Sequence, residues 1–587
     1  MSHRDAGYAA VPSDTPEQSA KQTIGALSET FEISKSLMLR LLGVVYGFAF
    51  YGAFVQNAAL LGEHGLSPSR FTRSDAASRL DGFTSQPSIW WLLPDWIPLN
   101  DRSMETLSAI GVAFSILVAL GCHSWLVMLL LWLLDFSVVT SAESSSFYQY
   151  GWESQLLETG FLAIFLCDGP LPLRTAWPFG EHTRARASPI ILWLLRWLCF
   201  RISLGAGLIK MRGGSCWAAR TCLWYHFETQ PIPSPLSFIF HFLPKPVLSW
   251  AVDLDVFVQF YSSWLVLLPG VLLPLRALRR LGGFIQAGFM VNIACSGNLA
   301  FLNHLTLVPC LAALDDSCWP RSLHRGQQPR RPSAHRSLDT FGRLSRGALD
   351  VSLLAMIAYL SWPVVENLLQ LGGTRQVMNR SFGSLRLVNT YGAFGSVGEA
   401  RYEPIVQFSS TGHPGDWWDL ELPWAYLLTY LLTYLLAYLL TYLLRWELEL
   451  PCKPGNVTRR PCFCAPYHYR LDWNIWFLGF KPHAHMLRQR ESWLYALIAK
   501  LLEGDQGPYA LLDASSVAKL ASLQTPPRFA KVDMFRYTMA APLHTLGLEW
   551  LRAEAPVVWW RREFEETLIP VMTLGADGRL QPAARHL

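Results

Sequence analysis

The residues best suited to chemistry lie between Leu194 and Pro235, where an apolar segment containing Arg196 and Arg201 leads into a loop rich in Lys, Arg, Cys, His and Glu. A charged side chain at the centre of a bilayer costs roughly 2.5–3.5 kcal/mol, so both arginines must face the protein interior or a polar cavity. An ion pair with a neighbouring helix explains them most simply. A binding or catalytic cleft is the alternative, because intramembrane charges also mark functional sites.

Common catalytic motifs are absent from the sequence. It has no GxxxxGK(S/T) phosphate loop, no GxSxG nucleophile elbow, no HExxH zinc motif and no CxxC redox pair. ATP-driven chaperone action, lipase activity and disulfide isomerisation are therefore not expected. We expect no catalytic residue, no cofactor and no metal site.

The elements that must position these residues are membrane helices. Hydrophobic residues make up 51% of the 587 residues, charged residues make up 16%, and the mean hydropathy is +0.21. The net charge of +5 is spread over loops, which does not favour nucleic acid as a partner. At about 20 residues per span, apolar runs predict nine membrane spans, near 37–61, 105–122, 124–141, 153–168, 188–209, 247–275, 281–297, 299–314 and 348–371.

Loop charges predict the orientation of these spans. Arginines concentrate in 169–187, in the RALRR turn at 276–280 and in 317–347, which carries seven arginines and one acidic residue. Such an excess on one set of short loops is typical of the cytosolic side. The polar first 36 residues lack the features of a cleaved signal peptide. We therefore predict a cytosolic N-terminus (1–36), about eight spans within 37–316, a cytosolic Arg-rich linker (317–347), a ninth span (348–371) and a lumenal domain (372–587).

Sequons and cysteines agree with a lumenal C-terminal domain. Asn379 and Asn456 begin the two sequons, and both follow the ninth predicted span. Several cysteines fall on the predicted lumenal side, where an oxidising compartment permits disulfides. Candidate pairs are Cys216 with Cys222 and Cys452 with Cys462, although the connectivity cannot be read from sequence.

The sequence pattern of the C-terminal segment is typical of a folded α+β domain. SLRLVN (384–389) and EPIVQF (403–408) are predicted strands, and NTYGAFGSVG (389–398) is a predicted glycine-rich turn region between them. PYHYRLDWNIWFLGF (466–480) fits either a strand or an amphipathic helix, whereas SWLYALIAKLLEG (492–504) predicts a helix that ends at Gly504. The fold class predicted is a polytopic α-helical membrane domain followed by a lumenal α+β, β-rich soluble domain.

A Leu/Tyr repeat with a period of four residues interrupts this domain at 424–446, between the similar sequences WDLELP and WELELP. Because an α-helix has 3.6 residues per turn, tyrosines spaced by four residues do not form one face. The repeat is long enough to span a bilayer. A low-complexity expansion at the membrane interface is the competing interpretation.

Several motifs resemble the lipase maturation factor family. They are YQYGWESQLLETGFLAIFL (148–166), the stretch from RWLCFRISLGAGLIKMRGGSCW to TCLWYHFETQPIPSPLSF, VNTYGAFGSVGEARYEPIVQ (388–407), and CKPGNVTRRPC with PYHYRLDWNIWF (452–477). The resemblance covers most of the chain, apart from the repeat, and leaves open a type 1 or a type 2 member. It implies a multi-pass endoplasmic reticulum protein that assists the maturation and secretion of homodimeric lipases such as lipoprotein lipase.

Such a factor would act by binding a partly folded client, without nucleotide hydrolysis. The expected partners are secreted lipases and the lipid bilayer, and no enzymatic activity is expected. The candidates for client contact have an alternative role in fixing the backbone, and they are Tyr391, Phe394, Arg401, Tyr402, Glu403, His468, Arg470, Asp472 and Trp473.

The membrane half is also similar, more distantly, to the superfamily that includes the vitamin K-dependent carboxylase, which implies chemistry in a membrane-embedded cavity. Lys210, His226 and Glu228 would lie at its lumenal mouth, where a desolvated lysine can act as a base. Glu153 and Glu158 would face Arg196 or Arg201. A membrane enzyme therefore stays open as an alternative function, and so does a transporter.

Overall fold

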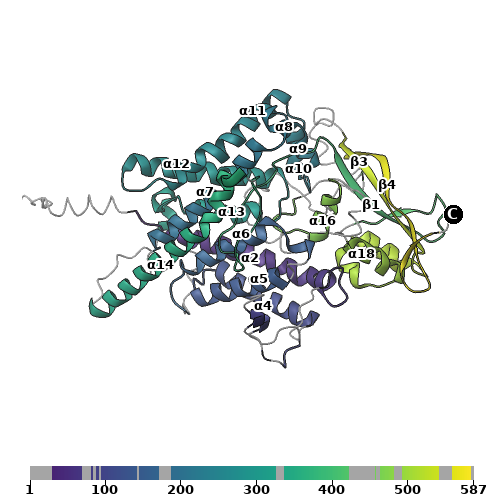
Figure 1. Ribbon diagram of the computed structural model, residues 1–587, viewed down its shortest axis with the longest axis horizontal. Coiled ribbons are helices and arrows are strands. Elements are labelled where there is room, and N and C mark those ends of the chain that lie inside the picture. The colour runs from purple at the N-terminus through teal and green to yellow at the C-terminus, as the bar shows by residue number, and fades with distance from the viewer. Residues whose placement is uncertain are drawn as a thin grey trace, which may run out of the picture.

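The computed structural model describes residues 29–68, 81–83, 88–91, 94, 96–98, 100–141, 145–170, 187–324, 336–373, 375–421, 457, 463–480, 492–540 and 558–583. Up to residue 373 the described chain is helical (Figure 1). Its α-helices are α2 (Glu32–Leu61), α4 (Asp101–Ala119), α5 (Trp125–Ser141), α6 (Gly151–Ile164), α7 (Pro189–Arg212), α8 (Ser215–Ala218), α9 (Cys222–Thr229), α10 (Pro235–His241), α11 (Lys245–Val256), α12 (Leu273–Ser296), α13 (Leu302–Leu311) and α14 (Arg336–Leu369). Short 3-10 helices are η2 (Ile89–Trp91), η3 (Ser146–Tyr148), η6 (Asp316–Cys318), η7 (Arg321–His324) and η8 (Leu371–Gly373).

Among the described residues, four helices are long and apolar enough to cross a membrane: Glu32–Leu61, Asp101–Ala119, Pro189–Arg212 and Ser345–Leu369. Trp125–Ser141 and Leu302–Leu311 are shorter apolar helices. α12 and α14 expose large apolar side chains, among them Phe284, Val351 and Trp362. Exposed apolar faces of this kind suit contact with lipid.

The helix predicted at 247–275 is less regular than expected. α11 continues into a π-helical turn, η4 (Phe257–Tyr261), and a 3-10 segment, η5 (Ser262–Leu267), which ends before Pro269. Proline cannot donate the backbone hydrogen bond that would prolong a helix. α12 therefore begins separately, at Leu273. π-Helical turns are rare and are frequently found at functional sites.

The C-terminal part contains an antiparallel five-stranded sheet with the order β2-β1-β3-β4-β5. Its strands are β1 (Arg401–Ser409), β2 (Trp418–Asp419), β3 (Phe529–Met539), β4 (Trp560–Leu574) and β5 (Leu580–Pro582). Between β2 and β3 lie α16 (Arg470–Leu478), α18 (Ser492–Glu503), η9 (Gly507–Leu511) and α19 (Ala514–Ser522). The helical N-terminal part followed by this sheet confirms the predicted fold class.

Some of the elements predicted in the C-terminal part are present in the structure and one is not. EPIVQF lies in β1, and α18 ends before Gly504, whose φ of +80° is a left-handed conformation that favours glycine. PYHYRLDWNIWFLGF contains the helix α16. The strand predicted at 384–389 is wrong, since this segment makes only one isolated bridge, between Ser381 and Asn389. The repeat at 424–446 lies outside the described residues.

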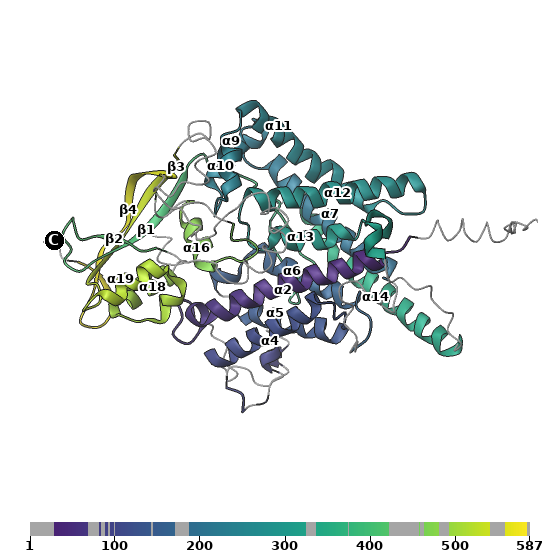
Figure 2. The ribbon, with the colours of Figure 1, turned by 180° about the vertical axis from the view of Figure 1, so that it is seen from behind.

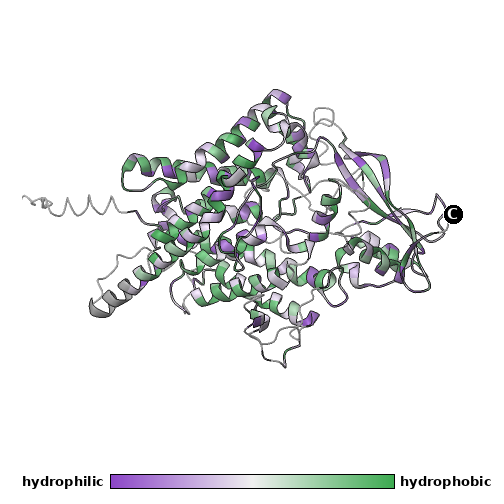
Figure 3. Cartoon of the chain, in the orientation of Figure 1, coloured by the Kyte–Doolittle hydropathy of each residue, from purple (hydrophilic) through white to green (hydrophobic). Residues whose placement is uncertain are grey.

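The sheet and the helical part share a continuous hydrophobic core. One cluster of buried side chains includes Leu42 of α2, Leu195 of α7, Trp473 of α16 and Val532 of β3. α2 runs along the helical part, and its C-terminal end reaches η9 beside α18 (Figure 2). Apolar residues dominate the helices, whereas the strands carry both polar and apolar residues (Figure 3). Helix-rich and sheet-rich parts therefore pack as one body with the sheet at one end.

Candidate functional site

A buried ion pair joins α6 to α7. Glu158 and Arg201 are 1% and 2% exposed, and Nη2 of Arg201 donates to Oε1 of Glu158. The other carboxylate oxygen accepts from the backbone N–H of Asn389 at 3.1 Å and from the hydroxyl of Tyr391 at 2.7 Å. Nη1 of Arg201 donates to the carbonyl of Asn389 at 2.8 Å. The segment after α14 is thereby fixed against the helices, because its backbone satisfies intramembrane charges instead of pairing as a strand.

A second buried ion pair joins α6 to α16. Nη1 of Arg470 donates to Oε1 of Glu153 at 2.6 Å and to the carbonyl of Phe147 at 2.8 Å. The expectation that both glutamates face Arg196 or Arg201 was therefore only half right. Glu158 pairs with Arg201, whereas Glu153 pairs with a residue 317 positions later in the chain. The Nε of Arg196 donates to the carbonyl of Leu192 in its own helix at 3.3 Å.

Arg401 anchors the sheet to the end of α9 and to the loop that follows it. Its guanidinium donates to the carbonyls of Glu228 and Pro231, each at 2.9 Å, and to that of Gln230. The same group pairs with Glu403 on the same face of β1. The carboxylate of Glu228 in turn accepts from the backbone N–H of Met539 in β3 at 2.9 Å. The charged residues of the VNTYGAFGSVGEARYEPIVQ motif thus connect the two parts of the molecule.

Most candidates for client contact are buried. Tyr391, Arg401, Glu403, His468, Arg470, Asp472 and Trp473 are each at most 5% exposed, and Phe394 and Tyr402 are half-buried. Buried side chains cannot meet a client without rearrangement. Their positions favour the alternative interpretation, in which they fix the backbone and join helices to sheet.

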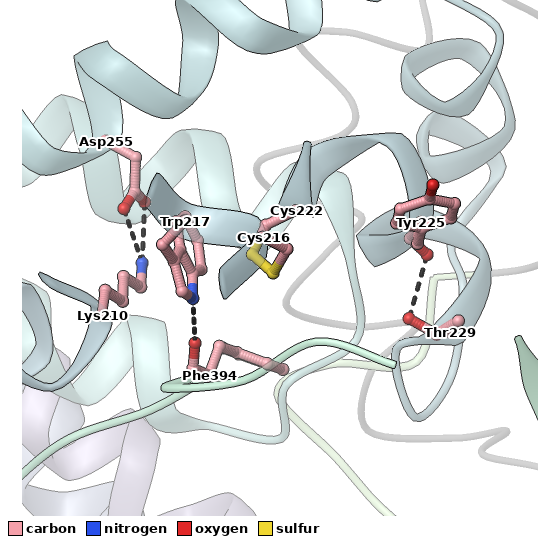
Figure 4. Close-up of a disulfide and its surroundings, with 8 residues drawn as sticks. All are labelled: Lys210, Cys216, Trp217, Cys222, Tyr225, Thr229, Asp255 and Phe394. Atoms are coloured by element: carbon pink, nitrogen blue, oxygen red, sulfur yellow. Dashed lines mark hydrogen bonds and ion pairs between the residues drawn. A yellow bond between two sulfur atoms is a disulfide. The ribbon is translucent and has the colours of Figure 1, made fainter. Parts of the chain in front are cut away.

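Lys210 lies beside a cavity in the helical part and is held by an acid. Its ammonium group donates to both carboxylate oxygens of Asp255, at 2.9 and 2.7 Å, above the ring of Trp217 (Figure 4). The indole of Trp217 donates to the carbonyl of Phe394 at 2.8 Å. His226 lines the same cavity, whereas Glu228 is not among its lining residues. The predicted group of Lys210, His226 and Glu228 is therefore divided, and Asp255 is a partner that the sequence did not reveal.

The remaining candidates are the disulfide cysteines and the glycosylation sites. Cys216 of α8 and Cys222 at the start of α9 form a disulfide (Figure 4). Asn379 is exposed at a positive φ of +52°, and its side chain lies against Gly151. Asn456, Cys452 and Cys462 lie outside the described residues.

A further charge cluster forms at the end of the helical part away from the sheet. The guanidinium of the fully buried Arg279 donates to Glu29 at 2.8 Å and to Asp315 at 3.2 Å. Asp316 accepts from the backbone N–H of Glu32 at 2.9 Å, at the start of α2. The start of α2, the first turns of α12 and the loop after α13 therefore lie together. The RALRR sequence at 276–280, predicted as a turn, lies inside α12. The three regions are those that the charge pattern assigned to a common side.

The buried imidazole of His468 makes stability sensitive to acid. Burial and the nearby Arg470 hold the pKa of His468 well below its ordinary value, and its ring packs against Trp152 and Phe301. Because the unfolded chain binds this proton first, stability is present at neutral pH and is lost as pH falls below about 6.5. The slope from one such histidine is about 1.4 kcal/mol per pH unit.

Replacing His468 by phenylalanine is expected to make this acid-induced loss shallower, because the ring packing stays while the proton site disappears. Thermal unfolding of the purified protein in detergent, followed from neutral pH to about pH 5, measures the slope. His413→Phe is the control, since His413 is exposed. Parallel profiles for wild type and His468→Phe would contradict the assignment.

Comparison with known proteins relates both parts of the chain to one family. Residues 33–321 match the model described as the lipase maturation factor transmembrane domain, and residues 442–570 match the lipase maturation factor C-terminal domain. Lipase maturation factor 1 of Homo sapiens is 35% identical over 98% of this chain and 94% of its own length.

Other relatives also match over most of both chains. Lipase maturation factor 1 of Mus musculus is 37% identical over 94% of this chain and 90% of its own length. Lipase maturation factor 2 of Homo sapiens is 27% identical over 94% of this chain and 84% of its own length. No solved structure is significantly similar to the chain.

Proposed function

The chain belongs to the lipase maturation factor family, and we propose on that basis that it assists the late folding and assembly of secreted homodimeric lipases such as lipoprotein lipase. The observation that carries this proposal is the nearly full-length similarity to relatives named lipase maturation factor 1. The identities to these relatives, 35–37%, exceed the 27% to the human type 2 relative and favour a type 1 role.

The proposed location is the endoplasmic reticulum membrane, with a cytosolic N-terminus and a lumenal sheet. The loop arginines support this orientation through the positive-inside pattern. The arrangement of the charged loops is compatible with it, because Glu29, Arg279 and Asp315 meet at the end opposite the sheet. In this orientation the sheet meets newly translocated lipase chains.

We propose that the client binds to the edge of β4 that does not face β3. Binding alone, without a chemical step, would then assist the client. Within the described residues, the stretch 563–570 takes part in ladder pairing with β3 and not with β5, which pairs from Met572 onward, while the backbone N–H of Trp560 donates to the carbonyl of Val457. A free strand edge can pair with an extended segment of another chain. Phe564 lies on this stretch, is 60% exposed and packs edge-on against Phe535. Preferential binding of a partly folded client would favour its assembled state without nucleotide chemistry.

The test is rescue of secreted lipoprotein lipase activity in cells that lack their own maturation factor. The full chain and a 424–451 deletion are expected to rescue, whereas Phe564→Ser is expected to rescue less at equal protein level. Leu385→Ser is the matched control, since Leu385 is an exposed apolar residue in the segment before the sheet. Failure of well-expressed full-length protein to rescue would contradict the proposed client, and equal rescue by Phe564→Ser would contradict the proposed surface.

Because Lys210 lies beside a cavity, a membrane enzyme remains the second candidate function. The bidentate contact with Asp255 makes this lysine a hydrogen-bond donor, so the arrangement does not present a free amine base. Lys210→Arg separates the two functions within the same rescue assay, because arginine keeps the cation but is not deprotonated in proteins. Full rescue by Lys210→Arg would exclude base chemistry at this position from lipase maturation.

A further inference from the structure

A cavity of about 460 Å³ lies in the helical part between α7, α11, η4, α12 and α13. This volume falls within the range of about 300–1,000 Å³ that is typical of small-molecule sites. Most of its lining is apolar, with Ile202, Leu248, Val258 and Met290 as examples. The half-buried Phe394 closes one side of the cavity and belongs to the segment that leads to β1.

The mouth of the cavity opens on an apolar surface. Val247 and Leu254 of α11 line the cavity and are 45% and 44% exposed. Gly288 of α12 lines it from the opposite helix and is exposed as well. Their neighbours Trp250, Phe257 and Phe284 are about half exposed or more. In a membrane protein an apolar face of this kind meets the hydrocarbon of the bilayer, so a lipid can enter laterally.

The charges inside the cavity cancel. Its charged lining residues are Lys210 and Asp255, which form an ion pair with each other. Burial and the positive charge of Lys210 lower the pKa of His226 to about 3, so this imidazole is neutral at physiological pH. An anionic or a cationic head group would therefore be desolvated here without a free counter-charge.

Buried neutral polar side chains complete the lining of the cavity. Gln259 sits on the π-helical turn η4 and is 5% exposed, and its Oε1 has no hydrogen-bond partner among the described residues. Asn303 of α13 is 3% exposed and lines the same cavity. Buried polar groups are normally hydrogen-bonded, so the amide oxygen of Gln259 beside a cavity indicates a ligand that supplies the missing donor.

We propose that this cavity binds an uncharged single-chain glycerolipid from the bilayer, with its acyl chain among the apolar side chains of α7, α11 and α12. The hydroxyl and ester groups of the head would be hydrogen-bonded by the neutral polar side chains of His226, Gln259 and Asn303. This site is separate from the free edge of β4 proposed for client contact.

Head-group selectivity of the wild-type protein tests the charge argument. Mono-oleoylglycerol, oleoyl lysophosphatidic acid and oleoyl lysophosphatidylcholine share the acyl chain and differ in head group. With purified, delipidated full chain in detergent, we expect saturable stabilisation by mono-oleoylglycerol and an affinity about tenfold or more weaker for the other two lipids. Absence of saturable binding of mono-oleoylglycerol, or equal affinity for lysophosphatidic acid, would overturn the proposal.

Filling the cavity tests its location. A Cβ added at Gly288 meets no atom within 4 Å, so Gly288→Phe places a ring at the mouth without a clash at Cβ. Gly347→Phe is the matched control, because Gly347 is also an exposed helical glycine with open space and lies on α14, outside the cavity. Gly288→Phe is expected to weaken mono-oleoylglycerol binding about tenfold or more, and Gly347→Phe is expected to leave it unchanged. Equal binding by both variants would place the lipid elsewhere and overturn the assignment.

Discussion

Replacing Arg401 by methionine is expected to lower the free energy of unfolding by about 3–5 kcal/mol, the effect typical of removing one partner of a buried ion pair. The guanidinium is 1% exposed and donates to three backbone carbonyls, one at the end of α9 and two in the loop that follows, as well as to Glu403. Methionine has a similar length but no donor. The three carbonyls would lose this donor, and Glu403 would lose the guanidinium charge.

The consequence is loss of the anchor between sheet and helices, so secreted lipase activity in the rescue assay should fall together with stability. Thermal unfolding and limited proteolysis of the purified variant measure the loss of stability. Arg579→Met is the matched control, because the Arg579–Asp577 pair is exposed, with side chains 88% and 64% accessible. Exposed pairs contribute little, so this control should behave as wild type. An Arg401→Met protein as stable as Arg579→Met would contradict the anchoring role.

Replacing Glu158 by leucine is expected to have an effect of similar size, about 3–5 kcal/mol, because Arg201 would keep a buried charge without its carboxylate. The backbone N–H of Asn389 and the hydroxyl of Tyr391 would lose their acceptor at the same time. The segment that joins α14 to β1 should then detach from α6 and α7. Increased protease sensitivity within 375–400 would report this release.

A double-mutant cycle separates the ion pair from general damage. Glu158→Leu combined with Arg201→Leu removes both charges, so the double variant should be less destabilised than the sum of the two single variants. Tyr391→Phe is a graded control that removes a single hydrogen bond to a charged group, with an expected cost of about 1.5–3 kcal/mol. Strict additivity of the two leucine variants would show that Glu158 and Arg201 do not stabilise each other.

Both predictions concern residues that the sequence marked as unusual without revealing their partners. Arg201 was expected to need a buried acid, because a charge in an apolar helix must be compensated. The nearby candidates Glu153 and Glu158 could not be distinguished by spacing, since both lie within the same apolar segment. Arg470, the partner of Glu153, lies far away in sequence and reaches α6 because α16 packs against β1 and against η3, just before α6.

The sequence by itself determined the properties that depend on local composition. Apolar runs predicted a helical membrane part, alternation predicted β1, and Gly504 ended α18 because its left-handed conformation favours glycine. The motifs also identified the family, which nearly full-length relatives confirm. These features follow from side-chain polarity and backbone preference within a few turns of chain.

Only the tertiary structure decided which distant residues meet. It assigned Lys210 to Asp255, Arg401 to backbone carbonyls at the end of α9 and in the loop after it, and the segment 384–391 to α6 and α7 instead of to a strand. It also buried most of the residues that the motifs had suggested for client contact. The physical reason is that a buried charge is stabilised by whichever opposite charge or carbonyl the packed helices and sheet bring within hydrogen-bond distance, and this choice depends on three-dimensional packing instead of sequence spacing.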